Sequence, residues 1–197
     1  MTKASLKFFR RFIIIVLILF GLNVAKDLFF QNLLEKRIAE LTGHPTTIGA
    51  LHVSLLGGSF HAKDVLLSQT GNFEKGTVAW ISECTVDWDL PAFIQGNYKI
   101  RQMWIVIEEL FVIKKRDGEV NLKALQRENP FPLVVEALDL TVLRVIYKNY
   151  ETVPLTISEW YPRIRHKRYQ NLQTIEELVQ AVFLTPFLEE AREAGFQ

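Results

Sequence analysis

Cysteine is almost absent from this sequence. Cys84 is the only one in 197 residues, so the chain forms no intramolecular disulfide and no cysteine zinc cluster. It stands in an alternating apolar pattern typical of a strand, where a lone thiol fills the core as a small apolar side chain. A reactive thiol needs a neighbouring base, and the sequence around Cys84 shows none. The pattern therefore favours a structural cysteine.

Signatures of catalysis are also missing. The chain has no nucleophile elbow, no phosphate-binding loop and no dinucleotide-binding glycine fingerprint. Glu108 and Glu109 are the only adjacent carboxylates inside an apolar strand pattern. Neighbours on a strand face opposite sides of its sheet, whereas a catalytic carboxylate pair shares one site. We expect a bulge or an exposed strand edge there, no enzymatic activity and no cofactor.

The histidines lack the short spacing of a metal site. They are His44, His52, His61 and His166. His52 and His61 are placed to meet across a hairpin that turns at residues 57–58, but no third ligand accompanies them. The sequence predicts no metal site.

Net charge is small, since 23 basic residues face 22 acidic ones. Such a balance gives no general attraction to a polyanion. One dense basic run, flanked by aromatic residues, invites three interpretations: single-stranded nucleic acid, lipid headgroups or a solvated strand or loop. The candidate headgroup contacts are Arg163, Arg165, Lys167 and Arg168. The location predicted below argues against nucleic acid.

The N-terminus predicts a membrane anchor. Basic residues at 3, 7, 10 and 11 precede residues 12–22, which contain no polar side chain. This pattern suits either a cleaved signal peptide or a signal anchor. Asn23 occupies a position where a cleavage site needs a small residue, and a helix over residues 8–30 reaches across the bilayer with snorkelling basic residues. We expect residues 1–30 to be a cytoplasmic tip plus an uncleaved transmembrane helix, with residues 31–197 on the far side.

An amphipathic helix is expected to follow the anchor. Leu33, Leu34, Ile38 and Leu41 lie on one face, and Gly43 ends the helix. A core-facing helix is one interpretation, and a helix lying flat on lipid is the other. Near the end of the chain, a capping box at 174 and 177 predicts a C-terminal helix.

The body of the chain reads as strands. They are expected over residues 51–56, 60–68, 78–90, 100–115, 138–150 and 153–157, with a tight turn at 57–58. In the fourth and fifth of these the apolar set changes parity, which predicts bulges that keep one face inward and bend the strand. The expected fold is α+β: a transmembrane helix, then a curved antiparallel sheet packed on the amphipathic helix, then a C-terminal helix. The curve of the sheet either encloses that helix or leaves an apolar trough.

Several short motifs occur in a characteristic order. They are Leu41-Thr42-Gly43, Thr47-Ile48-Gly49, Asp64-Val65-Leu66-Leu67, Gly71-Asn72-Phe73, Gly96, Lys99-Ile100, Arg116-Asp117-Gly118 and Asn121-Leu122. Over residues 6–125 this order resembles the N-terminal module of the AsmA-like proteins, which are bacterial inner-membrane proteins with large periplasmic β-regions. The resemblance implies a single-pass inner-membrane protein with a cytoplasmic N-terminus and a periplasmic main domain. It also implies a role in outer-membrane biogenesis, with phospholipid moving along an apolar β-groove.

Two functions follow as hypotheses. The first is an accessory protein of envelope biogenesis that binds phospholipid in such a groove. The candidate groove residues are Trp80, Val86, Trp88, Met103, Ile105 and Ile107. The second is a structural protein–protein interaction module at the inner membrane, with a filled core, another envelope protein as its partner and no lipid cargo. Neither hypothesis involves nucleic acid.

Overall fold

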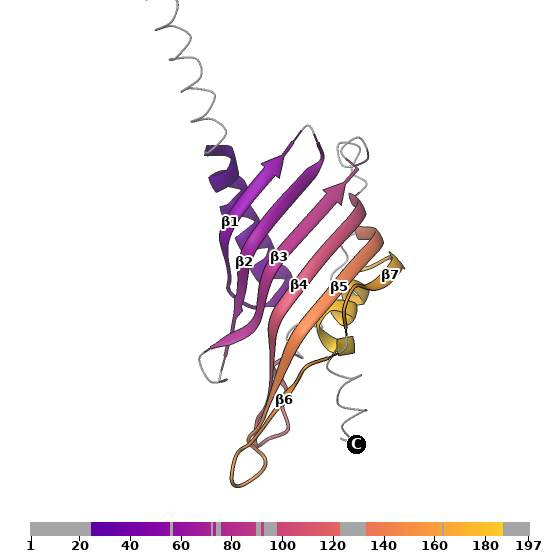
Figure 1. Ribbon diagram of the computed structural model, residues 1–197. Coiled ribbons are helices and arrows are strands. Elements are labelled where there is room, and N and C mark those ends of the chain that lie inside the picture. Colours follow the sequence, from indigo (N-terminus) through magenta and orange to yellow (C-terminus); the bar gives the residue numbers. More distant parts are fainter. Residues whose placement is uncertain are drawn as a thin grey trace, which may run out of the picture.

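The computed structural model describes residues 25–55, 57–71, 73, 76–89, 92, 98–122, 133–162 and 164–186. Residues 25–42 form a helix, and a seven-stranded sheet follows it (Figure 1). The strands are β1 (Thr46–Ser54), β2 (Ser59–Ser68), β3 (Thr77–Trp88), β4 (Tyr98–Lys114), β5 (Leu133–Asn149), β6 (Thr156–Trp160) and β7 (Lys167–Leu172). Two short helical segments, α3 (Ile175–Val179) and the π-helical turn η2 (Gln180–Leu184), follow β7.

The strands lie in the order β1-β2-β3-β4-β5-β6. Neighbours are antiparallel except β4 and β5, which pair in parallel along their whole lengths. Because β4 occupies one edge of β5 throughout, β6 and β7 share the other edge, opposite residues 145–149 and 135–140. A parallel pair needs a connection of a dozen or more residues, and residues 115–132 provide one. The sheet is therefore mixed, and the prediction of a purely antiparallel sheet is wrong.

The predicted transmembrane helix is also corrected. Within the described ranges, no helix is long and apolar enough to cross a membrane. The helix over residues 25–42 carries charges on several sides, including Lys26, Asp27, Lys36 and Arg37, whereas a spanning helix needs about 20 consecutive apolar residues. Residues 8–24 of the predicted span lie outside the described residues. This finding overturns both the predicted fold class and the single-pass inner-membrane localisation.

One face of the sheet carries the hydrophobic core, and we call it the inner face. The helix over residues 25–42 packs on it through Phe30, Leu34, Ile38 and Leu41. Leu33, predicted to share that face, is 41% exposed. The α3 and η2 segments lie on the same side of the sheet (Figure 1) and bury their apolar side chains in the same core. The helix over residues 25–42 and the α3 and η2 segments therefore both cover parts of the inner face.

The start of α3 has the capping hydrogen bonds that the sequence predicts. Thr174 accepts a hydrogen bond from the Glu177 backbone N–H at 3.1 Å, and the Glu177 carboxylate accepts one from the Gln173 backbone N–H at 2.6 Å. These bonds satisfy backbone donors that have no partner inside the helix. The predicted helix start at Thr174 is confirmed.

A single line of irregular positions crosses the sheet. In four strands, successive buried residues are three apart instead of two. These pairs are Ile48 and Leu51, Ala62 and Val65, Ile107 and Leu110, and Val142 and Val145. The strand pairings skip Gly49 and Asp64 between β1 and β2, Asp64 and Ser82 between β2 and β3, and Glu108 and Leu143 between β4 and β5. The parity changes predicted for β4 and β5 are confirmed, and they belong to a break that bends neighbouring strands at one level.

The turn between β1 and β2 packs against the end of β3. Gly58 has a φ of +60°, and a Cβ there would lie 2.9 Å from the Trp88 carbonyl oxygen. The Gly58 carbonyl accepts a hydrogen bond from the Trp88 N–H at 2.8 Å. Glycine is required here both by the left-handed backbone and by the close approach.

Replacing Gly58 with alanine is expected to lower the free energy of unfolding by about 2 to 3 kcal/mol, because a left-handed alanine costs about 1 to 2 kcal/mol before the clash is added. Urea unfolding followed by circular dichroism measures this change. Gly71→Ala is the matched control, since Gly71 has a φ of +68° and a Cβ there would meet no atom within 4 Å. Equal losses in the two variants would mean that the contact with Trp88 is unimportant.

Candidate functional site

Four of the six candidate groove residues come together on the inner face. Val86 lies opposite Met103, and Ile105 and Ile107 continue along β4. Their exposed fractions are 2%, 8%, 6% and 0%, and they belong to one continuous core cluster. At these residues the inner face is packed, so a lipid chain would have to displace part of the core.

The two tryptophans of the predicted groove are placed differently. Trp80 is 36% exposed and lies on the opposite side of the sheet, which we call the outer face. The irregular line explains this, because β3 changes register beside Ile81 and the alternation that linked Trp80 to Val86 reverses there. Trp88, at the end of β3, is partly buried against the core of the inner face and packs its ring on Phe60 with centroids 5.8 Å apart.

The basic run lies in and before β7. Arg165 and Arg168 are exposed, and the Lys167 ammonium lies 5.4 Å from the centroid of the Tyr169 ring. Arg163 lies outside the described residues. Arg168 stands opposite Asp139 in β5, which offsets part of the positive charge. Headgroup contact by these residues stays a prediction.

His52 and His61 do meet across the hairpin, as predicted, since they face each other in the β1–β2 register. Each has its own acidic neighbour. His52 Nδ1 lies 3.4 Å from an Asp27 oxygen, and His61 Nε2 lies 3.3 Å from a Glu83 oxygen. In the part of the chain that the structure describes, no three or more His, Cys, Asp or Glu residues form a group able to hold a metal ion.

An open strand edge is the most distinctive surface of this fold. β6 ends the strand order and pairs only with β5 among the described strands. The hairpin before it, the strand itself and the residue after it expose large apolar side chains. We call these the 153–161 surface; they are Val153 (88% exposed), Leu155 (42%), Ile157 (58%) and Tyr161 (69%). An unpaired edge with exposed apolar side chains is a template for another strand.

A polar network on the outer face fixes β6 to β5. Arg144 in β5 forms ion pairs with Glu109 and Glu159, the latter at 3.0 Å, and the Tyr161 hydroxyl donates to Glu159 at 2.7 Å. The Tyr161 hydroxyl and the Arg144 guanidinium together hold the pKa of Glu159 below its usual range. The network therefore keeps β6 and Tyr161 in place while the apolar side chains of the surface remain in solvent.

The break in the sheet also changes the outer face next to this network. Glu108 and Glu109 line the same shallow hollow of about 340 Å³, together with Trp80 and Tyr161. The predicted bulge at this pair is confirmed on the β3 side, where Ile81 pairs with Ile107 and Trp80 with Glu109, so that Glu108 has no counterpart. The expectation that the two carboxylates face opposite sides is wrong, because the bulge turns both to the outer face. Arg144 neutralises one of them, so the hollow does not hold an isolated catalytic pair.

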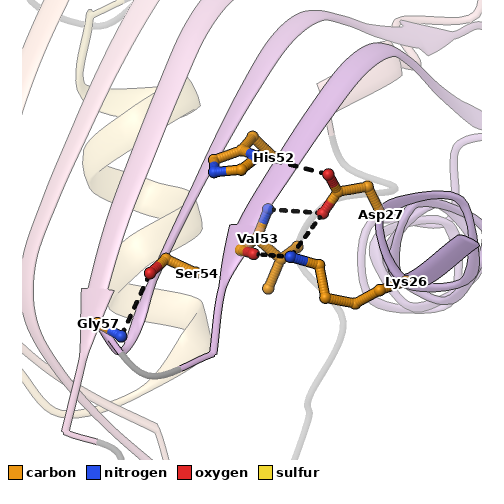
Figure 2. A network of polar contacts seen from close by, with 6 residues as sticks. All are labelled: Lys26, Asp27, His52, Val53, Ser54 and Gly57. Atoms are coloured by element: carbon orange, nitrogen blue, oxygen red, sulfur yellow. Dashed lines mark hydrogen bonds and ion pairs between the residues drawn. The ribbon is translucent and has the colours of Figure 1, made fainter. Parts of the chain in front are cut away.

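The other edge of the sheet is covered. Figure 2 shows the end of the helix over residues 25–42 beside β1: the Val53 N–H donates to Asp27 Oδ1 at 3.0 Å, and Lys26 donates to the Val53 carbonyl. Two turns further along, the Ile48 N–H donates to Glu35 at 2.8 Å and Gln31 donates to the Ile48 carbonyl at 2.6 Å. Lys26, Asp27, Gln31 and Glu35 are called the guard below. The guard satisfies the edge as the backbone of a neighbouring strand would.

The environment of Asp27 keeps it charged. Partial burial opposes the carboxylate, but the Val53 N–H, Lys26 and His52 outweigh that cost and hold the pKa of Asp27 below its usual range. A carboxylate stabilised in this way contributes at neutral pH and loses its effect only in acid, as the pH falls through the lowered pKa. The guard is therefore in place under ordinary conditions.

The sequence analysis identified neither the β6 edge nor the covered β1 edge as a functional surface. A strand was predicted over residues 153–157, but β6 begins at Thr156. The alternating apolar side chains of Val153, Leu155 and Ile157 are exposed to solvent. That alternation resembles a half-buried strand, and nothing local shows that no neighbour covers it. The one-turn spacing of Asp27, Gln31 and Glu35 was visible as a helix face, but its target in β1 was not.

Comparisons with known proteins identify no family for this chain. No protein-family model matches it, and neither a curated protein nor a solved structure matches it. The resemblance to AsmA-like proteins therefore stays a prediction from the motifs.

Proposed function

We propose that this chain is a non-catalytic binding module that takes an extended segment of a partner protein onto the open edge of β6. The observation that carries the proposal is that no described strand besides β5 pairs with β6, in combination with the exposed apolar side chains of the 153–161 surface. Strand addition uses main-chain hydrogen bonds for affinity and side-chain contacts for selectivity.

The β6 edge needs no rearrangement to accept a strand. Arg144, Glu159 and Tyr161 already hold β6 in place against β5, so little conformational entropy is lost on binding at β6 itself. By contrast, β7 on the same side of β5 carries Lys167 and Arg168, and the flanking His166 and the strand residue Asn171 have positive φ values. Charges and irregular backbone of this kind protect a strand edge. The partner is therefore expected at β6 and not along β7.

The chemistry of the edge indicates the kind of segment it takes. Leu155, Ile157 and Tyr161 favour β-branched or aromatic side chains on the partner strand. The Glu159 carboxylate already pairs with Arg144 and accepts a hydrogen bond from Tyr161, so it adds little attraction for a basic partner. We expect apolar contacts and backbone hydrogen bonds to contribute most of the affinity for the partner strand. The AsmA-like resemblance suggests an envelope-assembly protein as the partner.

Lipid binding remains the second proposal that the resemblance suggests. Burial of Val86, Met103, Ile105 and Ile107 weighs against it, since these residues already pack in the core. The two proposals separate in one experiment. Organic extraction of the purified full chain followed by mass spectrometry is expected to yield no stoichiometric phospholipid, and a phospholipid present at about one per chain would favour the groove instead.

A photo-crosslinking residue placed at Val153 in the full chain, expressed in its native cells, is expected to form a discrete adduct with a protein. Adding Leu155→Lys and Ile157→Lys is expected to reduce that adduct about tenfold, because lysines on an edge oppose strand pairing. Mass spectrometry of the adduct identifies its chemical class.

Leu66→Lys is the matched control for these substitutions. Leu66 is 37% exposed but belongs to β2, which has a strand on both sides, so the adduct is expected to survive the change. A missing adduct, or an equal loss with Leu66→Lys, would contradict the proposal. An adduct that consists only of phospholipid would replace it by the lipid hypothesis.

A further inference from the structure

The shallow hollow on the outer face combines aromatic rings with carboxylates. Its volume of about 340 Å³ is near the small end of the range of roughly 300 to 1,000 Å³ in which small ligands bind. The residues that line it come from β3, β4, β5 and the position just after β6. They are Trp80, Glu108, Glu109, Leu143, Arg144 and Tyr161.

The charge around this hollow is negative. Arg144 is shared between two carboxylates, since it forms ion pairs with both Glu109 and Glu159. Glu108 adds a third carboxylate, so three negative charges surround one positive charge. Such a group of charges attracts a cation and repels an anion. The hollow therefore selects a positively charged ligand.

Glu108 is the carboxylate that remains available to a ligand. The bulge leaves it without a counterpart in β3, and its side chain is half-buried. No described residue forms a hydrogen bond or an ion pair with it. A carboxylate makes its strongest hydrogen bonds with charged donors, and an ammonium group offers three N–H donors.

The rings and Leu143 suit the apolar part of such a ligand. Trp80 is 36% exposed and Tyr161 is 69% exposed, so both rings are accessible from solvent. Ring faces attract an ammonium group, and they also cover the methylene stem that carries it. The Tyr161 hydroxyl is already held by Glu159 at 2.7 Å, which lowers the entropy lost on binding.

We propose that this hollow binds an alkylammonium group, with the ammonium at Glu108 and the methylene stem against Trp80 and Tyr161. Two sources supply this chemistry: the lysine side chain of a protein and a free alkylamine. The hollow shares Tyr161 with the 153–161 surface but lies on the outer face of the sheet and needs no added strand. The proposal is therefore separate from strand addition at β6.

The test titrates the ¹⁵N-labelled full chain with n-butylammonium and follows the indole N–H signal of Trp80 by NMR. The dissociation constant is expected to be on the order of 1 mM, as for one charge-assisted hydrogen bond supported by ring contacts. Two probes with the same butyl stem are the controls. Both 1-butanol, which has no charge, and pentanoate, which is an anion, are expected to bind at least about tenfold more weakly.

Glu108→Gln removes the charge, keeps the shape of the side chain and is expected to weaken n-butylammonium binding about tenfold. Glu136→Gln is the matched control, since it removes the same charge from the same sheet. Glu136 pairs with Lys99 at 2.7 Å and lies seven residues along β5 from Leu143, about 23 Å away. Binding is expected to be unchanged in this variant.

Far-ultraviolet circular dichroism checks that each variant is folded. If Glu108→Gln does not fold, Trp80→Leu takes its place. Its titration is followed at the backbone amide of Leu143, and the affinity for n-butylammonium is expected to fall about fivefold because one ring is lost.

Unchanged affinity in a folded Glu108→Gln chain overturns the proposal, and so does binding of 1-butanol as tight as that of n-butylammonium. N-acetyl-lysine N-methylamide distinguishes the two sources. Tighter binding of this compound than of n-butylammonium supports a lysine of a protein, whereas equal or weaker binding supports a free amine. The titration contains no partner protein, so its result does not depend on whether β6 accepts a strand.

Discussion

Replacing Ile107 with alanine is expected to lower the free energy of unfolding by about 3 to 4 kcal/mol. Ile107 is fully buried at the irregular line of the sheet, between Ile81 in β3 and Val142 in β5. The loss combines the transfer energy of the removed methyl and methylene groups with the cavity left between three strands. Urea unfolding of the full chain measures it.

The same variant distinguishes a packed core from a lipid groove. If Ile107 lined an open groove, the alanine variant would lose about 1 kcal/mol or less, because no cavity would form inside the protein. Leu66→Ala is the matched control, since Leu66 lies 37% exposed on the outer face of β2. A loss at Ile107 no larger than the loss at Leu66 would contradict the packed inner face described here.

The second large effect is expected at Asn121, where Asn121→Ala should cost about 3 kcal/mol of unfolding free energy. Asn121 is fully buried just after β4. Its side-chain amide donates to the Phe111 carbonyl at 2.9 Å, and its oxygen accepts from the Ile113 N–H at 2.9 Å. Alanine leaves both backbone groups unpaired near the core, which is more costly than losing the bonds alone.

Asn32→Ala provides the comparison for Asn121. Asn32 also donates from its side chain to a backbone carbonyl, that of Leu28 at 3.0 Å, but this bond is exposed to solvent. Water replaces it, so the change is expected to stay within about 0.5 kcal/mol. Similar losses in the two variants would show that the buried position of Asn121 is not what matters.

The sequence predicted those parts of the fold that depend on neighbours in the chain. The hairpin turn at residues 57–58, the bulge in β4, the parity change in β5 and the cap at Thr174 follow from local sequence patterns, and each is confirmed. The predicted strand 78–90 was right in extent for β3 but wrong in its faces. Trp80 was assigned to the side of Val86, because a break in alternation within β3 leaves no local mark when both candidate faces carry apolar residues.

The candidate site was less predictable. Val86, Met103, Ile105 and Ile107 were grouped correctly on one face, since period-two alternation defines a face without reference to other strands. Whether that face is open or filled depends on where the helices pack. The 153–161 surface was read as an ordinary strand because alternation does not reveal how many neighbours a strand has.

By itself, the sequence determined where strands bend and where turns and caps occur, because these follow from side-chain alternation, glycine and hydrogen-bonding side chains within a few residues. Only the tertiary structure decided that β4 and β5 run parallel, that the bends of neighbouring strands fall on one line, and that helix side chains cover one edge while no described strand pairs with the other. These features arise from pairing between residues far apart in the chain, and that pairing is selected by the packing of the whole sheet and its helices.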